Sequence, residues 1–135
     1  GYEPLTFVTA DNNGESIYHT NVILTIATEF ALICLDMIPD PLRKKEIAAR
    51  LTNSGRTVIE LDRNQISEFA GNALEMMGRD GRILAISQRA ASALRKDQIA
   101  VIEKSARLLP LHIPTIELAG GSVRCMIAGI HLTAR

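Results

Sequence analysis

The fold is decided by six consecutive apolar residues, Phe30-Ala31-Leu32-Ile33-Cys34-Leu35. A strand with one wet face alternates apolar and polar side chains, whereas a strand covered on both faces is apolar throughout. Pro39-Asp40-Pro41 follows and predicts the start of a helix that runs to about Leu51 and ends at Asn53-Ser54-Gly55. Thr57-Val58-Ile59-Glu60-Leu61 predicts the next strand. A buried strand, a helix and a second strand in this order predict an α/β fold.

The flanking segments continue this mixture of strands and helices. Asp62 is placed to cap a short helix, because its carboxylate accepts hydrogen bonds from the free N–H groups of a first turn. Gly78-Arg79-Asp80-Gly81 is typical of a turn between two strands. The other expected elements are a strand at 7–10, a turn at 11–14, a strand at about 17–25, a helix from 62 to 69, hairpin strands at 73–77 and 82–86, a helix from 88 to 106 broken near Lys96-Asp97, and strands at 108–113 and about 123–132.

The expected elements form an internal repeat. The order strand, strand, helix, strand occurs at 19–61 and again at 72–118, and a third unit begins near the end of the sequence. The two units end in similar sequences, Val58-Ile59-Glu60-Leu61 and Pro114-Thr115-Ile116-Glu117-Leu118. We therefore expect two copies of one structural unit.

Three polar residues follow the same period, because His19, Asn72 and Cys125 lie 53 residues apart. In units arranged around an axis, residues at the same point of each unit converge on that axis. The alternative is coincidence, since two equal intervals are weak evidence by themselves.

The composition is that of an ordinary globular domain of 135 residues, with 47% apolar and 22% charged residues. The 15 basic and 15 acidic residues cancel, and five aromatic residues offer few stacking platforms, so we expect no nucleic-acid partner. The longest apolar run is far shorter than the ~20 residues that span a bilayer, and the start does not look like a signal peptide. We therefore expect no membrane association.

The two cysteines, Cys34 and Cys125, do not resemble a disulfide framework of a small secreted domain. A reduced, cytoplasmic location is the expectation that follows. The three histidines are scattered, and neither a CxxC nor an HExxH motif occurs, so we expect no metal site.

Cys125 is the candidate nucleophile. It lies in Gly120-Gly121-Ser122-Val123-Arg124-Cys125-Met126, where glycines allow a ligand to approach the backbone closely. A thiol becomes nucleophilic when a nearby cation stabilises its thiolate. The alternative is a buried, inert cysteine, which suits Cys34 inside its apolar run better than Cys125.

His19, in Ile17-Tyr18-His19-Thr20-Asn21-Val22, is the candidate general acid and base for that thiol. Taken alone, this motif favours the alternative, an ordinary histidine at a strand end with a satisfied hydrogen bond. Glu60 and Glu117 each lie at the end of an expected strand, within an apolar segment. Each either orients a histidine or binds a cationic group, or simply faces solvent. His112 and His131 are expected to be structural residues on strands.

Three motifs together resemble the carboxy-terminal half of the arginine deiminase/amidinotransferase (pentein) superfamily. They are His19-Thr20-Asn21-Val22, Phe69-Ala70-Gly71-Asn72-Ala73-Leu74-Glu75 and the Gly120–Met126 stretch, in that order. The resemblance covers essentially the whole chain, residues 1–135, and is greatest to the amidinotransferase-related citrulline-utilisation hydrolases. The third motif is the most specific, because it carries the nucleophile of that superfamily.

The resemblance implies a fold and a missing portion. The superfamily forms a five-fold α/β propeller of ββαβ units around a central site, so this chain would supply about two units and the start of another. A catalytic or substrate-binding carboxylate normally comes from earlier units. We therefore expect residues 1–135 to be a fragment of such a domain, completed by an N-terminal half or by another chain, possibly as a homodimer.

The resemblance also implies a covalent mechanism without metal or organic cofactor. Cys125 attacks the guanidino or ureido carbon, and His19 protonates the departing nitrogen and then activates water. Asn21, Asn72, Gly121 and Ser122 are the expected substrate-binding residues. Many deiminases have aspartate where this chain has Asn21, and a neutral amide favours a neutral ureido group such as that of citrulline.

Two other functions remain open at this point. An arginine deiminase or amidinotransferase acting on a guanidino substrate would use the same residues. A non-catalytic binding module of the same fold is the alternative from another class, although such a module has no need for a His/Cys pair.

Overall fold

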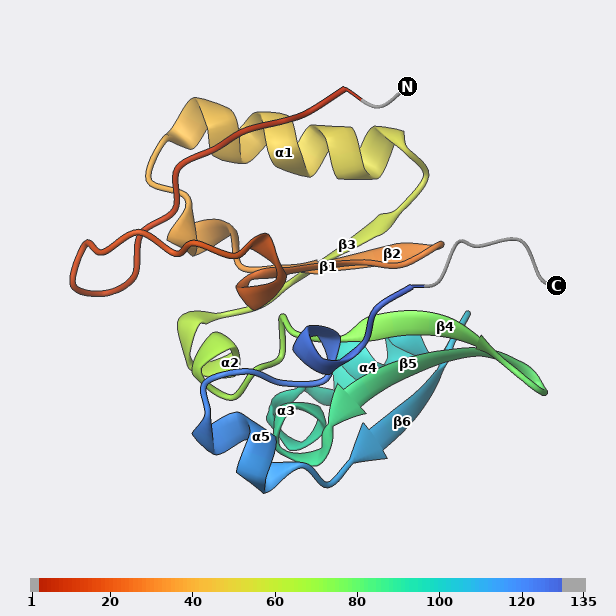
Figure 1. The fold of residues 1–135 in the computed structure, drawn as a ribbon. Coiled ribbons are helices and arrows are strands. Elements are labelled where there is room, and N and C mark those ends of the chain that lie inside the picture. Colours follow the sequence, from red (N-terminus) through yellow and green to blue (C-terminus); the bar gives the residue numbers. More distant parts are fainter. Residues whose placement is uncertain (1–2, 130–135) are drawn as a thin grey trace, which may run out of the picture.

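The computed structural model describes residues 3–129 and shows two three-stranded sheets with helices packed around them (Figure 1). This arrangement confirms the expected α/β class. The first sheet contains β1 (Leu24–Ile26), β2 (Phe30–Ile33) and β3 (Thr57–Glu60), and the second contains β4 (Leu74–Gly78), β5 (Gly81–Ser87) and β6 (Arg107–Leu111). The helices are α1 (Pro41–Asn53), α2 (Arg63–Ser67), α3 (Gln88–Ala93), α4 (Lys96–Ile102) and α5 (Pro114–Leu118), with 3₁₀ turns η1 (Thr20–Val22), η2 (Leu35–Met37) and η3 (Arg124–Met126).

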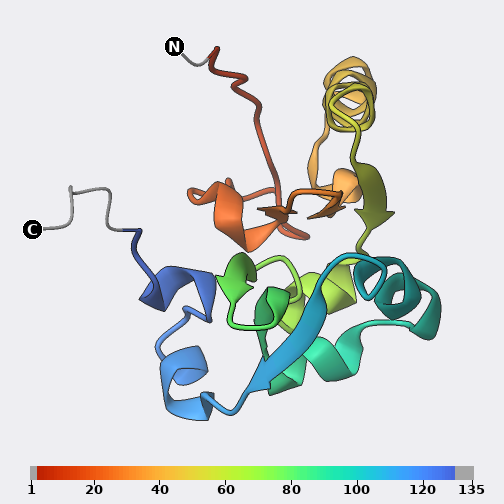
Figure 2. The same ribbon diagram turned by 90° about the vertical axis from the view of Figure 1, so that its right-hand side faces the viewer.

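The two sheets have the same topology, which confirms the repeat of strand, strand, helix, strand. In each sheet the first strand is antiparallel to the middle one, and the third is parallel to it. The parallel pairing requires a crossover, which α1 provides in the first unit and α3 with α4 in the second. Turned by 90°, the molecule shows α1 end-on above the first sheet (Figure 2).

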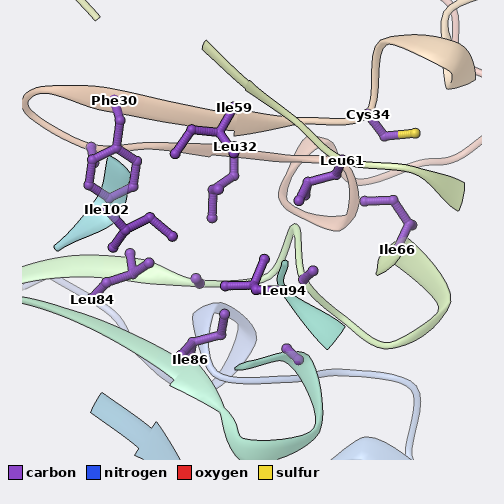
Figure 3. Packing of buried hydrophobic residues seen from close by; sticks show 14 of the residues in the cluster. Phe30, Leu32, Cys34, Ile59, Leu61, Ile66, Leu84, Ile86, Leu94 and Ile102 are labelled. Carbon is purple, nitrogen blue, oxygen red and sulfur yellow. The ribbon is translucent and has the colours of Figure 1, made fainter. Parts of the chain in front are cut away.

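Strand β2 is buried on both faces, as its unbroken apolar sequence predicts. Phe30 and Leu32 point into a core shared with the second unit, where Figure 3 shows them above Leu84 and Ile102. Ala31 and Ile33 belong to a second core beneath α1. Every residue of β2 is at most 1% exposed. One short strand therefore connects the two cores of the molecule, and burial of its apolar surface is a main source of stability.

Two buried glutamines join the units. Gln65 and Gln98 are 4% and 2% exposed, and each donates its Nε2 to the Oε1 of the other, at 2.7 and 3.2 Å. Gln65 also donates to Ala93 O, and Gln98 donates to Glu60 O. All polar atoms of the pair are satisfied, so the pair specifies how α2 and α4 meet without leaving a buried polar group unpaired.

Local capping signals predicted the helices well. Asp40 Oδ1 accepts hydrogen bonds from the N–H groups of Leu42 and Arg43 at the start of α1. Asp62 and Gln65 form a capping box at the start of α2. The expected break in the second long helix is confirmed, because it is interrupted between α3 and α4. Between residues 3 and 129, no helix has the length and apolar character needed to cross a membrane.

The segment that ends the second repeat, residues 114–118, is not a strand. Residues 114–118 form helix α5, and the structural counterpart of β3 is instead β6. Pro114 cannot donate a ladder hydrogen bond, and it occupies the first turn of α5, where no partner is needed. The expectation that residues 58–61 and 114–118 are equivalent was therefore wrong.

The N-terminal strand predictions were also wrong in large part. Residues 7–10 have no strand partner; Ala10 instead donates its N–H to Met37 O at 2.9 Å. Of the strand expected at about 17–25, the start of β1 is strand, and η1 replaces its middle. Ile23 donates its N–H to Thr20 O at 3.1 Å, which closes the 3₁₀ turn. The turn expected at 11–14 is present.

The strand expected at about 123–132 is absent from its described part. Residues 124–126 form the 3₁₀ turn η3. Here the N–H of Arg124 is bonded to Asn72, a residue distant in sequence, and is not available for a strand ladder. Residues 130–132 of that prediction, including His131, lie outside the described residues.

Candidate active site

Cys125 occupies the centre of η3, a tight turn held at both ends. Its N–H donates to Ser122 O at 3.1 Å, and the preceding N–H of Arg124 donates to Asn72 Oδ1 at 3.0 Å. The Cys125 side chain is exposed, whereas Val123, two residues earlier, is fully buried and anchors the turn. The structure thus presents an accessible thiol on a backbone that the rest of the molecule holds in place.

Asn72 is the main side chain beneath this thiol. It is 3% exposed and lies in the loop between α2 and β4. Its Nδ2 donates to Cys125 Sγ at 3.1 Å and to Asn21 O at 3.0 Å. Because its Oδ1 also accepts from Arg124, one amide side chain links three segments at the site. The convergence of Asn72 and Cys125 that their equal spacing implied is present in the fold.

Asn21 supplies a second amide to the sulfur. It lies within η1, and its Nδ2 is 3.6 Å from Cys125 Sγ. Its Oδ1 is buried and has no hydrogen-bond partner among the described residues. A buried acceptor without a partner is costly in an ordinary structural role.

The loop before Cys125 uses both glycines. Gly120 has φ +86°, a conformation that favours glycine. At Gly121 an added Cβ would lie 3.3 Å from Cys125 Cβ and 3.7 Å from Sγ, so the missing side chain leaves room beside the thiol. Ser122 is fully buried, and its Oγ donates to Glu117 Oε1 at 3.5 Å. Glu117 therefore braces this loop rather than ending a strand.

His19 lies at the edge of this arrangement. It immediately precedes η1, and Val22 donates its N–H to His19 O at 3.0 Å. The side chain is exposed and lines a cavity of about 240 Å³ with Phe7, Thr9 and Tyr18. Within residues 3–129 no hydrogen bond joins His19 to Cys125. The structure thus brings together Asn21, Asn72, Gly121, Ser122 and Cys125. It does not bring the His19 side chain into this group, although His19 lies only two residues before Asn21 in the sequence.

Two residues that assemble the site, Gly71 and Thr25, were not predicted from any sequence pattern of their own. An added Cβ at Gly71 would lie 2.3 Å from Val22 O, so only glycine allows the α2–β4 loop to touch η1. Thr25 Oγ1, which is buried, donates to Gly71 O at 2.8 Å and also contacts the backbone of Ala73. These contacts hold the loop of Asn72 against the segment of Asn21.

The two cysteines differ as expected. Cys34 is fully buried, and burial raises the pKa of its thiol, which makes it a poor nucleophile. Both cysteines are free. Over the described part of the chain, no cluster of histidine, cysteine and carboxylate side chains is arranged to hold a metal ion.

The sequence places the chain among known proteins through a family model that covers nearly all of it. The model described as N,N dimethylarginine dimethylhydrolase, eukaryotic, matches residues 1–132. The chain belongs to this family. Membership of the dimethylarginine dimethylhydrolase family places the protein in the guanidino-modifying pentein superfamily, as its three motifs indicated.

The fold of this family member is similar to a solved structure, the apo form of ArgZ, an arginine dihydrolase from the ornithine–ammonia cycle in cyanobacteria. The two share 14% sequence identity with a TM-score of 0.61, over 87% of this chain and 17% of that one. The similarity therefore concerns the fold, and the chain spans less than a fifth of the dihydrolase. A search of curated protein sequences gave no significant match.

Proposed function

We propose that this chain carries the nucleophile of a thiol-dependent hydrolase that cleaves a guanidino or ureido C–N bond. The observation that supports the proposal most directly is the pair of amide N–H groups, from Asn72 and Asn21, donated to the sulfur of an exposed cysteine. Hydrogen bonds to sulfur stabilise negative charge on it. A structural cysteine gains little from two such donors, whereas the hydrolytic family to which the chain belongs acts on a guanidino carbon.

The proposed mechanism has two stages. Cys125 Sγ attacks the central carbon, and a nitrogen leaves as an amine after receiving a proton from His19. Water, which gives a proton to the now neutral His19, then attacks the same carbon, and the C–S bond breaks to release the Cys125 thiolate. His19 immediately precedes η1, the turn that carries Asn21 to the sulfur, and this position on the same segment supports its proposed role.

For the substrate, we propose a neutral ureido group, as in citrulline. The Asn21 side chain carries no charge and cannot neutralise a guanidinium, but its unpartnered Oδ1 is able to accept an N–H from a ureido nitrogen. The family description favours a second candidate, N,N-dimethylarginine, and arginine itself is the third. These three compounds define the substrate panel.

Changing Asn21 to aspartate is expected to shift specificity towards guanidinium substrates. A carboxylate at this position would pair with the cation and hold two of its N–H groups. We expect the ratio of kcat/KM for arginine or dimethylarginine to that for citrulline to rise by about 10-fold, since charge-assisted pairs contribute roughly 1.5–3 kcal/mol. The measurement is steady-state kinetics of the full-length protein on all three compounds.

The matched control is Asn64→Asp, which makes the same substitution at an exposed position of α2. It should leave the specificity ratio unchanged. A wild-type enzyme that already prefers arginine strongly would rule out the ureido proposal, whatever the variant does.

Thiol trapping separates an enzyme from a binding module of the same fold. Full-length protein treated with a haloacetamidine, which mimics the guanidino group, should be labelled at Cys125, with one adduct located by peptide mass spectrometry. Cys34 serves as an internal control, because it is fully buried and should stay unlabelled. If Cys125 resists the reagent while partner binding is retained, the non-catalytic module becomes the better explanation.

We also propose that the two units are neighbouring parts of a larger propeller. Their identical topology supports this, as do the exposed apolar residues Ile26 and Met77 on the first strands of the two sheets, at 54% and 74% exposure. The remaining units, from the same or another chain or a second copy, would supply the substrate carboxylate. An active monomer of residues 1–135 alone would contradict this. Because the mechanism needs a reduced thiol, we place the protein in the cytoplasm.

A further inference from the structure

We propose that Arg89 is a positioning residue for the Cys125 thiol, a role that rests on the proposed function and deepens it. Arg89 is the second residue of α3, and within residues 3–129 its side chain donates hydrogen bonds to Glu68 and none to Cys125 or Gly121. Figure 1 shows α3 near α2 and α5, the two helices that lead into the loops around the thiol.

The first route runs through the α2–β4 loop. Arg89 forms a two-pronged ion pair with Glu68, through Nε to Oε2 and through Nη2 to Oε1 at 3.0 Å. The hydrogen bond from Arg89 lowers the pKa of the Glu68 carboxyl, which keeps the pair charged. The same guanidinium lies over the ring of Phe69, 5.4 Å from its centroid, in a cation–π contact. Two successive residues at the end of α2 are therefore held by one side chain.

Phe69 has a backbone conformation that these contacts would stabilise. Its φ is +65°, which among the described residues is the one positive φ outside glycine. An aromatic residue in this left-handed region is strained, and such strain persists where surrounding contacts stabilise it. Phe69 O accepts the N–H of Asn72 at 2.9 Å, so the strained turn sets the position of Asn72. Asn72 in turn contacts Cys125 Sγ at 3.1 Å.

The second route runs through α5. Arg89 and Glu117 line the same cavity of about 480 Å³, and the charge of Glu117 adds to that of Glu68 in raising the pKa of Arg89. Glu117 accepts a hydrogen bond from Ser122 Oγ, and Ser122 O accepts the N–H of Cys125. Arg89 is thus ion-paired with Glu68 at the end of α2 and lines a cavity with Glu117, whose helix leads into the loop of Cys125.

Because Arg89 is exposed, a substitution there should affect the site more than the stability of the fold. Its side chain is 48% exposed and that of Glu68 is 39% exposed, and solvent-exposed ion pairs contribute little to folding. A change at Arg89 should therefore leave the folded protein intact while the Phe69 turn and Asn72 lose their support. The expected defect lies in the reactivity of Cys125.

The test is a set of variants of the full-length protein: Arg89→Gln, Arg89→Lys, Asn72→Ala and the double variant R89Q/N72A. We expect Arg89→Gln to lower kcat and the rate of Cys125 alkylation by iodoacetamide about 10-fold each, with KM within about 2-fold and the melting temperature within about 2 °C. Arg89→Lys, which keeps the charge and loses the two-pronged geometry, should recover part of this loss. The matched control is Arg43→Gln, because Arg43 forms a comparably exposed ion pair with Glu46 on α1.

The double variant decides whether Arg89 acts through Asn72. In the Asn72→Ala background, Arg89→Gln should change kcat and alkylation by less than about 2-fold, because the linked residue is already absent. The proposal is overturned if Arg89→Gln alone has no effect on alkylation, or if it lowers alkylation equally in both backgrounds. Alkylation needs no substrate, so it decides this proposal even if the wild-type protein turns over none of the three compounds, a result that would reject the proposed function instead.

Discussion

Replacing Cys125 with serine should abolish turnover, lowering kcat by a factor on the order of 10⁴ or more. A serine hydroxyl is nearly isosteric with the thiol. It keeps its proton at neutral pH, however, and is then a far weaker nucleophile than a thiolate. The amides of Asn72 and Asn21 remain in place in the variant, so substrate binding should change little. The loss should therefore appear in kcat, with KM within about threefold, in steady-state kinetics of the full-length protein.

The control for this variant is Cys34→Ala. Cys34 is fully buried beside Leu61 and Ile66 in the core, and removing its sulfur leaves a small cavity (Figure 3). We expect a loss of about 1 kcal/mol in the free energy of unfolding, with kcat unchanged within about twofold. If Cys125→Ser kept more than a tenth of wild-type turnover, the covalent mechanism would be untenable.

Replacing Gly71 with alanine should cost both stability and activity. The new Cβ would lie 2.3 Å from Val22 O, a backbone atom that moves only if η1 moves. Overpacking of this kind costs about 3 kcal/mol in the free energy of unfolding, measured by urea denaturation. Since η1 also carries Asn21, its displacement should separate the Asn21 amide from Cys125 and slow both turnover and alkylation.

A second glycine shows whether the effect is steric. Gly55 has φ +86° and no atom within 4 Å of an added Cβ, so Gly55→Ala meets backbone strain without a collision. It should cost about 1 kcal/mol and leave activity unchanged. Equal stability losses in the two alanine variants, or full activity in Gly71→Ala, would show that the loop and η1 do not depend on their close approach.

Local sequence patterns predicted the elements whose causes are local. The capping aspartates before α1 and α2, the hairpin around Gly78 and Gly81, and the apolar run of β2 each act within a few residues. The family motifs were also readable from the sequence, since each is a short run of residue types. Their order led to the correct superfamily and to Cys125 as the residue to examine.

Two of the errors occurred where a distant segment competes for the backbone. The N–H of Arg124 is taken by Asn72, so a stretch with the composition of a strand becomes the turn η3. In the same way, η1 replaces the middle of the strand expected at about 17–25, where it lies against the backbone of Gly71. Neither competitor is visible in a local window of sequence.

The sequence by itself therefore determined the class of fold, its internal repeat and the identity of the candidate nucleophile. Helix caps, apolar periodicity and motif spacing are properties of neighbouring residues, and the chain carries them wherever it is placed. The surroundings of Cys125 were decided only by the tertiary structure, because the amides of Asn21 and Asn72 reach it across 104 and 53 residues. Their positions depend on a glycine that lets two backbones touch and on a strained turn at Phe69, and both are consequences of packing.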